Sequence, residues 1–533
     1  MSAVRAPTGS AVDAVRGFEG QAAIVAAMSL PAFYGSHRVA VERRETHVSH
    51  VFLAGDRAYK LKKAVVLPFA DLGTLERRRA MCHEEVRLNR RLAPKVYLGV
   101  RAVISRDGKL ELGPADDPGA LEYVVEMRRL DEGRSLAALI DRGRAGEPEV
   151  RALARCIAQF HATVPAVEPE AALAMLSHSS EETFATLEAI APPDLRVDVR
   201  AAKRFTAAFR AARAGELRER AATGRFRDGH GDLRLEHVFF DGVNVTVIDC
   251  AELAPRLRQV DVGADLSFLA MELHLRGKVA FADLLVDAYR SAGGDPGTGA
   301  LISFHAAERA WIRAKVALLR AAELPDASAE AGAKAMEAKD LAAVGRRLAW
   351  RARQPILLIV CGGAATGKTT LADELARVSD LPVLSSDRVR KRLAGIAPTE
   401  RGGEELYGRE SSAATYTELG RLAAAELEHG AGAIVDATFR RRADRDAFAA
   451  ALGAAVDPVY LECRAPAAVV AERAFRREAD PRRISDATAE IAVHQLDEFE
   501  PLDEVPSTRR RILDAALPPV ELARTVEELL DRP

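Results

Sequence analysis

The chain has 533 residues, too many for one ordinary domain, and this length suggests two or three. Hydrophobic residues make up 48% and charged residues 29%, which excludes a disordered chain and is ordinary for a soluble globular protein. Lysine and arginine (76) nearly balance aspartate and glutamate (78), so no overall positive field favours nucleic acid or an anionic membrane as a partner.

The first segment of the chain is apolar but does not have the layout of a signal peptide. The stretch QAAIVAAMSLPAF follows a long segment that contains Asp13 and Glu19. No apolar run reaches the roughly 18 residues that a membrane helix needs. We therefore expect a helical extension over residues 1–34 that docks on the next domain. The 5 cysteines are scattered and form no C-x-x-C pair, which favours a reducing cytoplasm over a disulfide framework.

The rest of the chain shows two different patterns. Residues 35–325 begin with short β-like runs, such as RAYKLKK and ALEYVVEMRRL, and continue with long helical stretches, which predicts an α+β domain. Residues 326–353 are rich in Ala, Glu, Lys and Arg, and we expect a helical connector there. From residue 354 to 533, unbroken apolar runs alternate with helical stretches, which is typical of a parallel sheet flanked by helices.

One constellation of the α+β domain carries chemistry: RDGHGDLRLEHVFFDGVNVTVIDC, with His230, Asp232 and Asp249. An aspartate in a tight loop, then a short strand pair, then a second aspartate, is the layout of kinase catalytic and metal loops. Phosphoryl transfer needs one carboxylate near the attacking hydroxyl and another on Mg²⁺. Asp232 is the candidate for the first role and Asp249 for the second. The alternative is a hairpin whose aspartates serve only turns, which explains Asp241 but not the spacing of HGDL and VIDC.

The segment from about residue 46 to residue 273 resembles the aminoglycoside phosphotransferase-like family, whose motif is H-G-D-x-x-x-x-N followed by an I-D pair. The resemblance implies a protein-kinase-like fold. His237 stands where the family has the asparagine that binds Mg²⁺. Imidazole suits softer metals than Mg²⁺. The substitution therefore either weakens one metal site or marks a domain that binds nucleotide without efficient transfer.

The nearer match is a subfamily in which such a domain is fused to a P-loop kinase, as YKLKKAVVLPFADLGTLERRR and IDCAELAPRLRQVDVGADLSFLAMEL indicate. This resemblance implies that Lys60 contacts the ATP phosphates and that Glu85 holds this lysine. Lys62, on the same strand face, is the rival, and a solvated edge strand is the alternative for both lysines. The resemblance also implies a hinge around Glu126 and a structural role for Asp265.

The sharpest motif of the chain is GGAATGKTT, which fits G-x-x-x-x-G-K-[ST] between an apolar strand and a helix. In this motif the loop backbone wraps phosphates, the lysine reaches the β- and γ-phosphates, and the Thr hydroxyl binds Mg²⁺. The alternative is a chance glycine turn, which the strand and helix on either side disfavour. The expected nucleotide-binding residues are Gly362, Gly363, Ala364, Ala365, Thr366, Gly367, Lys368, Thr369 and Thr370.

Three features after this loop favour a small kinase over a motor ATPase. Asp387 ends the strand of LPVLSSD and is a candidate to accept or orient the acceptor hydroxyl. Asp436 ends the strand of AIVDATF and is suited to hold Mg²⁺ through water. A helix N-cap is the alternative for both aspartates. The arginine run around Arg473 and Arg477 breaks at ADPRR and is interpreted as a lid that neutralises phosphate charge, against the alternative of a solvated helix face.

Residues from about 356 to 504 resemble a family of bacterial P-loop kinases, on GGAATGKTT, SSDRVRKRL, VDATF, LECRAP and RRISDATAEIAVHQLDEFEPL. More distant relatives of that family are gluconate kinase, chloramphenicol phosphotransferase, zeta toxins and the kinase domain of polynucleotide kinase. The resemblance implies that Lys368 and Thr369 bind ATP–Mg²⁺. It also implies that Asp387 and Arg390 face the acceptor, and that Arg473 and Arg477 belong to the lid.

These patterns predict an N-terminal protein-kinase-like α+β domain joined to a C-terminal P-loop α/β domain. The expected activity is a bifunctional, ATP- and Mg²⁺-dependent phosphotransferase that acts on hydroxyls of small molecules. A regulatory protein with a weak kinase-like domain and a P-loop ATPase switch is one alternative. In another, the P-loop half phosphorylates nucleotide sugars or nucleic-acid 5′ ends. The net charge of -2 and the 5% aromatic content disfavour nucleic acid.

Overall fold

The structure is a computed structural model that describes residues 21–35, 40–67, 70–325, 328–400, 402–453, 456–478 and 489–532. The chain divides into two compact units. Met1–Ser180 and Gly215–Gly297 make the first, and Glu181–Ala214 and Thr298–Pro533 make the second. Residues 1–20 of the expected extension and the ADPRR stretch of the expected lid lie outside the described residues.

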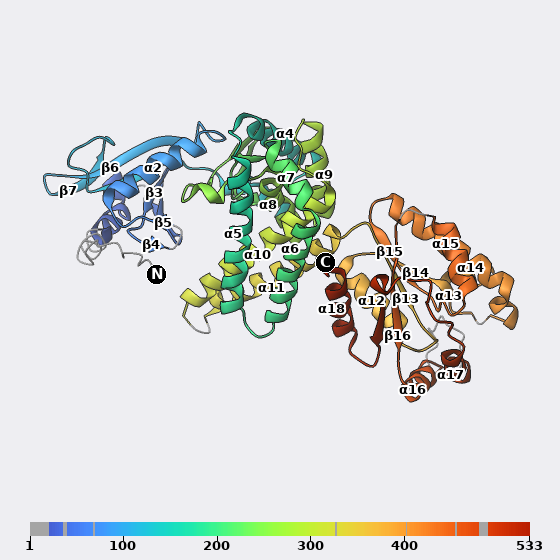
Figure 1. Cartoon of the computed structure of the whole chain (residues 1–533). Helices are drawn as coiled ribbons and strands as arrows, with labels where there is room; N and C mark the ends of the chain where they lie inside the picture. Colours follow the sequence, from blue (N-terminus) through green and yellow to red (C-terminus); the bar gives the residue numbers. More distant parts are fainter. Residues whose placement is uncertain are drawn as a thin grey trace, which may run out of the picture. The chain divides into compact units, whose positions relative to one another are not determined.

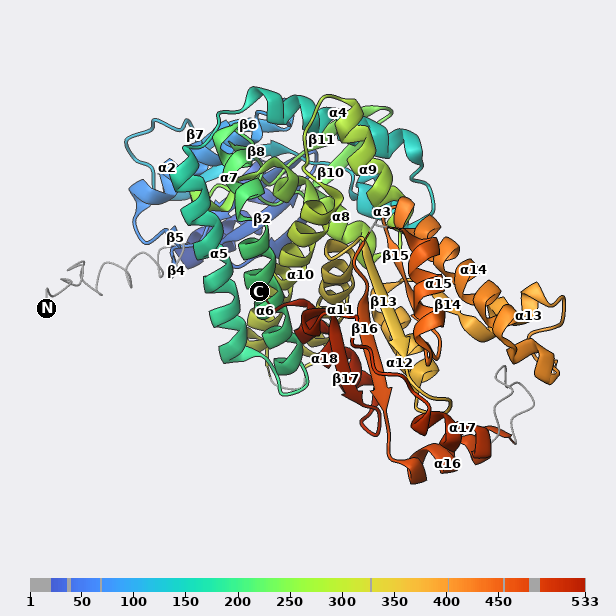
Figure 2. The same ribbon diagram turned by 45° about the vertical axis from the view of Figure 1, so that its right-hand side comes forward.

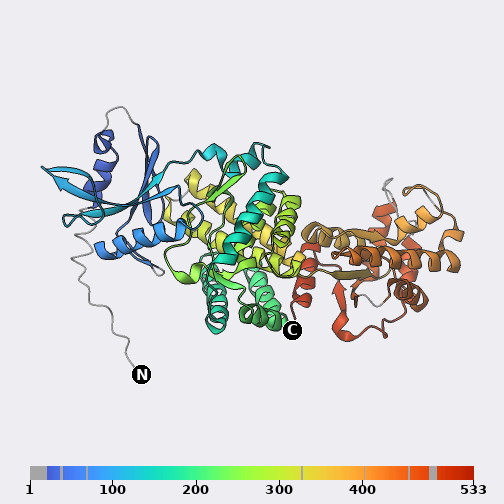
Figure 3. The same cartoon turned by 90° about the horizontal axis from the view of Figure 1, so that it is seen from above.

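The first unit begins with a six-stranded antiparallel sheet in the order β1-β2-β3-β8-β6-β7. These strands are β1 (Val41–Glu45), β2 (Ser49–Ala54), β3 (Arg57–Lys62), β6 (Tyr97–Arg106), β7 (Lys109–Gly113) and β8 (Glu122–Arg128), and a short pair is β4 (Val66–Leu67) with β5 (Ala70–Asp71). Helix α2 (Leu75–Asn89) lies along the strands (Figures 1 and 3). Successive side chains of a strand point to opposite faces, so this sheet has two cores.

Each face of the antiparallel sheet is covered by a different helix. On one face, Leu53 and Ala58 pack with Cys82 and Val86 of α2. On the other face, Phe52 and Leu61 pack with Ile24, Met28 and Phe33, and residues 21–28 are helical. The apolar segment near the N-terminus therefore covers the face that α2 leaves open.

The remainder of the first unit is helical apart from two short strand pairs. The helices are α3 (Leu136–Asp141), α4 (Glu147–Thr163), α5 (Pro169–Ile190, which continues into the second unit), α7 (Ala214–Ala222), α8 (Val262–Leu275) and α9 (Val279–Ser291). The strand pairs are β9 (Phe226–Asp228) with β12 (Gln259–Asp261), and β10 (Val238–Asp241) with β11 (Asn244–Val247). The loops around these pairs carry the HGD and VIDC motifs. Helix α8 supports these loops, and its residues 262–273 are all buried.

The second unit contains a five-stranded parallel sheet in the order β14-β15-β13-β16-β17 (Figure 2). The strands are β13 (Ile356–Cys361), β14 (Val383–Ser385), β15 (Gly432–Asp436), β16 (Val459–Arg464) and β17 (Arg510–Asp514). Every residue of β13 is buried, because helices cover both faces. On one face lie α12 (Lys368–Ser379) and α18 (Pro519–Leu530), and on the other α14 (Arg409–Glu428) and α15 (Arg442–Leu452). This confirms the predicted parallel α/β domain.

Three long helices belong to the same compact unit as the parallel sheet. They are α6 (Arg196–Ala212), α10 (Gly299–Glu323) and α11 (Ala329–Ala352). Residues 329–352 are helical, in the stretch expected to form a connector, and α10 and α11 pack against each other. The boundaries predicted at residues 325 and 354 follow changes of sequence pattern, whereas compactness groups these helices with the P-loop sheet.

Candidate active sites

Two lysines of β3 share one carboxylate on α2. They point to the same face because they are two residues apart. Lys60 Nζ lies 2.9 Å from Glu85 Oε1, and Lys62 Nζ lies 2.6 Å from Glu85 Oε2. The Lys62 side chain is 0% exposed and also pairs with Glu252, whereas the Lys60 side chain is 11% exposed and lies 2.7 Å from Asp249 Oδ1. Lys60 is therefore the lysine with access to a ligand, and Lys62 is an internal partner.

Charge pairing keeps this cluster ionised despite its burial. Burial lowers the pKa of Lys60, but Asp249 and Glu85 outweigh it, and the pKa lies well above its ordinary value. Burial raises the pKa of Asp249, but Lys60 outweighs it, and the pKa lies below its ordinary value. Asp249 has a φ of 64°, a left-handed conformation that is uncommon for non-glycine residues. Its backbone N–H donates to Tyr97 Oη at 3.2 Å, which fixes the loop to β6.

The side chain of Asp265, on α8, holds the HGD loop (His230, Gly231 and Asp232). Its carboxylate accepts from the backbone N–H groups of His230 at 2.7 Å and Gly231 at 2.8 Å, and it lies 3.0 Å from His161 Nε2. Burial raises the pKa of Asp265, but the His161 contact outweighs it, and the pKa is about 2. Gly231 has a φ of 82°, and a Cβ there would lie 2.5 Å from Leu257 O. Asp265 thus has the structural place that the resemblance implied.

His237 lies between the HGD loop and the loop that carries Asp249. Its Nδ1 donates to the backbone oxygen of Asp232 at 3.0 Å, and its Nε2 lies 3.6 Å from Asp249 Oδ2. The Asp232 side chain is 35% exposed and its Oδ2 lies 3.9 Å from His237 Nδ1. His230 is buried, and burial lowers its pKa to about 4, so this ring is neutral near pH 7. The structure thus brings Lys60, Asp249 and His237 together beside the loop that carries Asp232.

The P-loop has the backbone conformation that its motif requires. Gly362 has a φ of 135°, and a Cβ there would lie 2.5 Å from Cys463 O. Gly367 has a φ of 102° and precedes α12. Lys368 Nζ donates to Gly363 O at 2.6 Å, across the loop. The loop is therefore shaped to surround a phosphate group with backbone N–H groups.

The magnesium-type ligands of the second unit lie together at the carboxyl edge of the sheet. Thr369 Oγ1 donates to Asp436 Oδ2 at 2.7 Å. Burial raises the pKa of Asp436, and the nearby charge of Asp387 also raises it. Lys368 and the hydrogen bond from Thr369 lower this pKa but do not outweigh burial. Asp436 ends β15 and α15 begins only at residue 442, so the N-cap alternative for Asp436 is not supported. Ser385 is the N-cap of α13 (Ser386–Leu393), which contains Asp387 in its first turn.

The two arginines that the sequence assigned to acceptor and lid make backbone contacts. Arg390, which is 7% exposed, donates to Leu406 O at 2.9 Å. Arg473, on α16 (Ala467–Glu478), donates to Thr366 O at 3.3 Å and to Ala515 O at 2.9 Å. Arg473 thus reaches the P-loop, whereas Arg390 holds the turn before α14. Arg477 lies in α16, and its side chain is outside the described residues.

No metal-binding cluster is complete within the described ranges. No group of at least three His, Cys, Asp or Glu side chains there is arranged to hold a metal ion. The oxygen donors Thr369 and Asp436 suit Mg²⁺, which usually takes one or two protein ligands together with phosphate oxygens and water. The donor set of Thr369 and Asp436 is therefore of the kind that Mg²⁺ prefers.

Comparison with known proteins places the chain in a family. Residues 357–502 match a protein family described as an AAA domain. The Mycobacterium tuberculosis protein named "Uncharacterized protein Rv2004c" is 33% identical over 464 residues, which cover 85% of this chain and 89% of that protein. The chain belongs to the family of this mycobacterial protein. The P-loop kinase domain that the C-terminal motifs implied is confirmed.

Solved kinases are similar to parts of this family member. A sugar kinase from Janibacter is 22% identical, with a TM-score of 0.27, over 33% of this chain and 94% of that one. A choline/ethanolamine kinase family protein from Mesorhizobium loti is 16% identical, with a TM-score of 0.35, over 60% of this chain and 94% of that one.

No helix within the described residues has the length and apolar character needed to cross a membrane.

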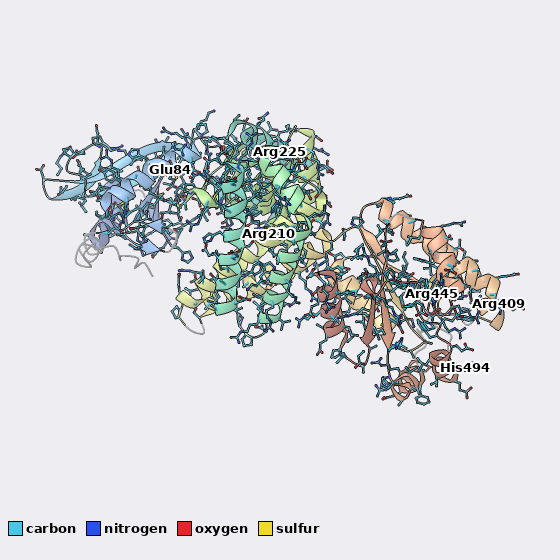
Figure 4. All side chains as sticks on the ribbon, in the orientation of Figure 1. Glu84, Arg210, Arg225, Arg409, Arg445 and His494 are labelled. Atoms are coloured by element: carbon cyan, nitrogen blue, oxygen red, sulfur yellow. The ribbon has the colours of Figure 1, made fainter. Side chains whose placement is uncertain are left out.

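One further cluster borders the P-loop site, and the motifs did not reveal it. Arg445 of α15, which is 3% exposed, donates to Phe439 O and Pro501 O, each at 2.9 Å, and pairs with Glu504 (Figure 4). It joins the loop after β15 to the acidic segment DEFEPLDE. The sign of this cluster in the sequence was the many carboxylates of this segment. Their partner, Arg445, lies about 60 residues earlier in the chain.

Proposed function

We propose that the chain is an ATP-dependent phosphotransferase with two nucleotide sites, each of which transfers the γ-phosphoryl group to a hydroxyl of a small molecule. One observation supports the proposal: in each unit a lysine interacts with a carboxylate, and we assign the lysine to the phosphates and the carboxylate to the metal ion. These pairs are Lys60 with Asp249, and Lys368 with Asp436, which accepts from Thr369. Kinase-type folds in both units support ATP-dependent phosphoryl transfer as the general activity. The scattered cysteines favour the cytoplasm as its setting.

In the first unit, the proton acceptor is Asp232. Its side chain is partly exposed on the HGD loop, where it accepts the proton of the attacking hydroxyl as the oxygen–phosphorus bond forms. Lys60 neutralises phosphate charge, and Glu85 keeps it in place. Asp249 and His237 would hold the metal ion, which supplies charge neutralisation across the phosphates when bound.

In the second unit, the P-loop backbone and Lys368 hold the phosphates, and Thr369 and Asp436 would hold Mg²⁺. Asp387 is the group that orients the acceptor hydroxyl: it lies in the first turn of α13, directly after β14 rather than at the end of the strand as expected, and its charge raises the pKa of Asp436. Arg473 reaches the P-loop backbone from α16 and is placed to offset phosphate charge. Arg390 acts on the acceptor side through the turn that it holds, and Arg477 remains part of the proposed lid.

The test is a metabolite screen with ATP labelled in the γ-phosphate, run on the full chain and on two variants. We expect Asp232→Ala to abolish one set of labelled products and Lys368→Ala to abolish a different set. If only one of the two variants loses labelled products, only that site transfers phosphate.

His237 favours a second candidate, a regulatory protein whose first unit binds nucleotide without transferring phosphate. In that case neither variant lowers transfer to any metabolite, and only Lys368→Ala lowers ATP hydrolysis. The same screen therefore separates the two functions.

A further inference from the structure

His237 presents an unpartnered ring nitrogen to Asp249. Its Nδ1 lies 3.0 Å from the backbone oxygen of Asp232. A carbonyl oxygen only accepts, so Nδ1 carries a proton, and Nε2 is the ring atom that faces Asp249. Within the described part of the chain, Nε2 makes no hydrogen bond. Its separation of 3.6 Å from Asp249 Oδ2 is too long for one. The residue is 8% exposed, so most of the ring lies among protein atoms.

The surrounding charges leave these two atoms facing each other. Asp249 Oδ1 is occupied by Lys60 at 2.7 Å, which leaves Oδ2 toward the ring. The other nearby carboxylate, Glu236 Oε1, lies 3.7 Å from Nε2 but is paired with Arg234 at 2.5 Å. A nitrogen and a carboxylate oxygen that face each other at this distance are placed to bind one cation between them.

The geometry suits a metal ion in that position. Metal bonds of about 2.1 Å place two ligand atoms roughly 3.0 to 3.6 Å apart at angles of about 90° to 120°. A backbone carbonyl on the other ring nitrogen is the usual contact that orients a metal-bound imidazole. With only two protein ligands here, nucleotide phosphates and water complete the coordination.

We infer that the first unit binds its nucleotide with a mixed nitrogen–oxygen metal site that prefers a first-row transition ion, with Mn²⁺ as the probe, to Mg²⁺. The inference rests on the proposed nucleotide site of this unit. Mg²⁺ demands oxygen ligands, whereas first-row transition ions bind imidazole more strongly. The carboxylate and phosphate oxygens keep the site open to Mn²⁺, which also accepts hard ligands.

The experiment uses the full chain with Lys368→Ala, which removes the P-loop site, loaded with Mn²⁺ and ADP. Electron spin-echo envelope modulation of the bound Mn²⁺ is expected to show coupling to a nitrogen nucleus. Labelling histidine with nitrogen-15 should change that coupling, and His237→Asn should abolish it. His237→Asn should also shift the ratio of Mn²⁺ to Mg²⁺ affinity by about tenfold or more toward Mg²⁺. His83→Asn, at an exposed position on α2, is the matched control and should change neither.

Two results would overturn the inference in different ways. If Mn²⁺–ADP binds without nitrogen coupling and His237→Asn leaves the affinity ratio unchanged, the metal preference is wrong while the nucleotide site stands. If Mn²⁺–ADP does not bind in the Lys368→Ala background, the proposed nucleotide site of the first unit fails, and the metal inference fails with it.

Discussion

Lys62 Nζ lies 2.6 Å from Glu85 Oε2, and both side chains are 0% exposed. Glu85 thus divides its two oxygens between an internal lysine and Lys60, the lysine that reaches Asp249. The other partner of Lys62, Glu252, lies three residues after Asp249. A second buried ion pair therefore joins β3 and α2 to the loop that carries the proposed metal ligand.

The two lysines should respond differently to substitution. Lys62→Met removes the ion-pair partner of buried Glu252 and leaves Glu85 with Lys60 alone, so we expect a loss of about 3–5 kcal/mol in the stability of the first unit. Lys60→Met, at the more exposed position, should cost less stability but lower the nucleotide affinity of this unit at least about tenfold. The measurements are hydrogen–deuterium exchange of β3 and α2, and ADP binding in the Lys368→Ala background.

The control for this prediction is the double variant Lys62→Met with Glu252→Gln. It removes the charge of Glu252 that Lys62→Met leaves without its partner, so it should recover part of the lost protection. Equal losses of stability for Lys60→Met and Lys62→Met would show that the two lysines are equivalent, contrary to their exposure.

Two adjacent glycines of the P-loop provide a matched pair. A Cβ at Gly362 would lie 2.5 Å from the Cys463 carbonyl oxygen, and its φ of 135° is strained for any other residue. A Cβ at Gly363 meets Leu496 Cδ2 at 3.1 Å, the end of a flexible side chain. We expect Gly362→Ala to cost about 1–3 kcal/mol and nearly all ATP binding at this site, and Gly363→Ala to cost less than about 1 kcal/mol.

This pair is best measured in the Lys60→Met background, so that only the P-loop site binds nucleotide. Titration calorimetry with ATP and Mg²⁺ gives the affinity, and urea unfolding gives the stability. Similar effects of the two substitutions would contradict the backbone geometry at Gly362.

The HGD loop should lose stability as the pH falls. Burial lowers the pKa of His230 to about 4, whereas an unfolded histidine titrates near about 6.5. Between these values the unfolded chain binds a proton that the folded chain does not, so stability falls by up to about 3 kcal/mol from pH 6.5 to pH 4. Asp265, with a pKa of about 2, withdraws its contribution only below about pH 4.

Hydrogen exchange of the loop, corrected for intrinsic rates, checks this prediction at a series of pH values. Tryptophan fluorescence does not serve, because the 2 tryptophans, Trp311 and Trp350, belong to the second unit. His230→Gln, which does not titrate in this range, should flatten the profile between pH 6.5 and pH 4. A profile as steep as the original would assign the loss to another group.

Sequence reasoning reached those parts of the sites in which neighbouring residues carry the chemistry. The P-loop could be predicted because Gly362, Gly367 and Lys368 perform one function within seven residues. The choice between Lys60 and Lys62 could not, because strand alternation puts both on one face and only Glu252 decides which is internal. Parallel α/β order was predictable for the same reason as the P-loop, since each strand and helix has its own local period.

The other parts of the sites could not be predicted, because their contacts join residues that are far apart in the sequence. Arg390 and Arg445 are charged residues that a sequence places at the surface, yet both are buried and bond backbone carbonyls from segments 16 and 55 to 56 residues away. The contact between α11 and the P-loop unit was hidden likewise, because α18, which receives the hydrogen bonds of Arg346 and Trp350, is more than 150 residues later in the chain.

The last prediction concerns α11, on which the P-loop sheet depends. Glu527 of α18 accepts from Trp350 Nε1 at 2.8 Å and from Arg346 Nε at 2.7 Å, and Trp350 is 0% exposed. Arg353 adds a contact of 2.6 Å to Asp531. Glu527→Ala leaves buried Trp350 Nε1 and partly buried Arg346 without this acceptor, so we expect a loss of about 2–4 kcal/mol and a red shift of tryptophan emission.

Urea unfolding of the full chain, followed by tryptophan fluorescence, measures this effect. Glu527→Gln retains an acceptor for Trp350 and should cost less than Glu527→Ala. A fragment of residues 354–533 lacks all three partners on α11 and its end, so we expect it to unfold at lower urea than the full chain or to aggregate. A fragment as stable as the full chain, together with an unchanged midpoint for Glu527→Ala, would show that the P-loop domain begins at residue 354 and that α11 is only a connector.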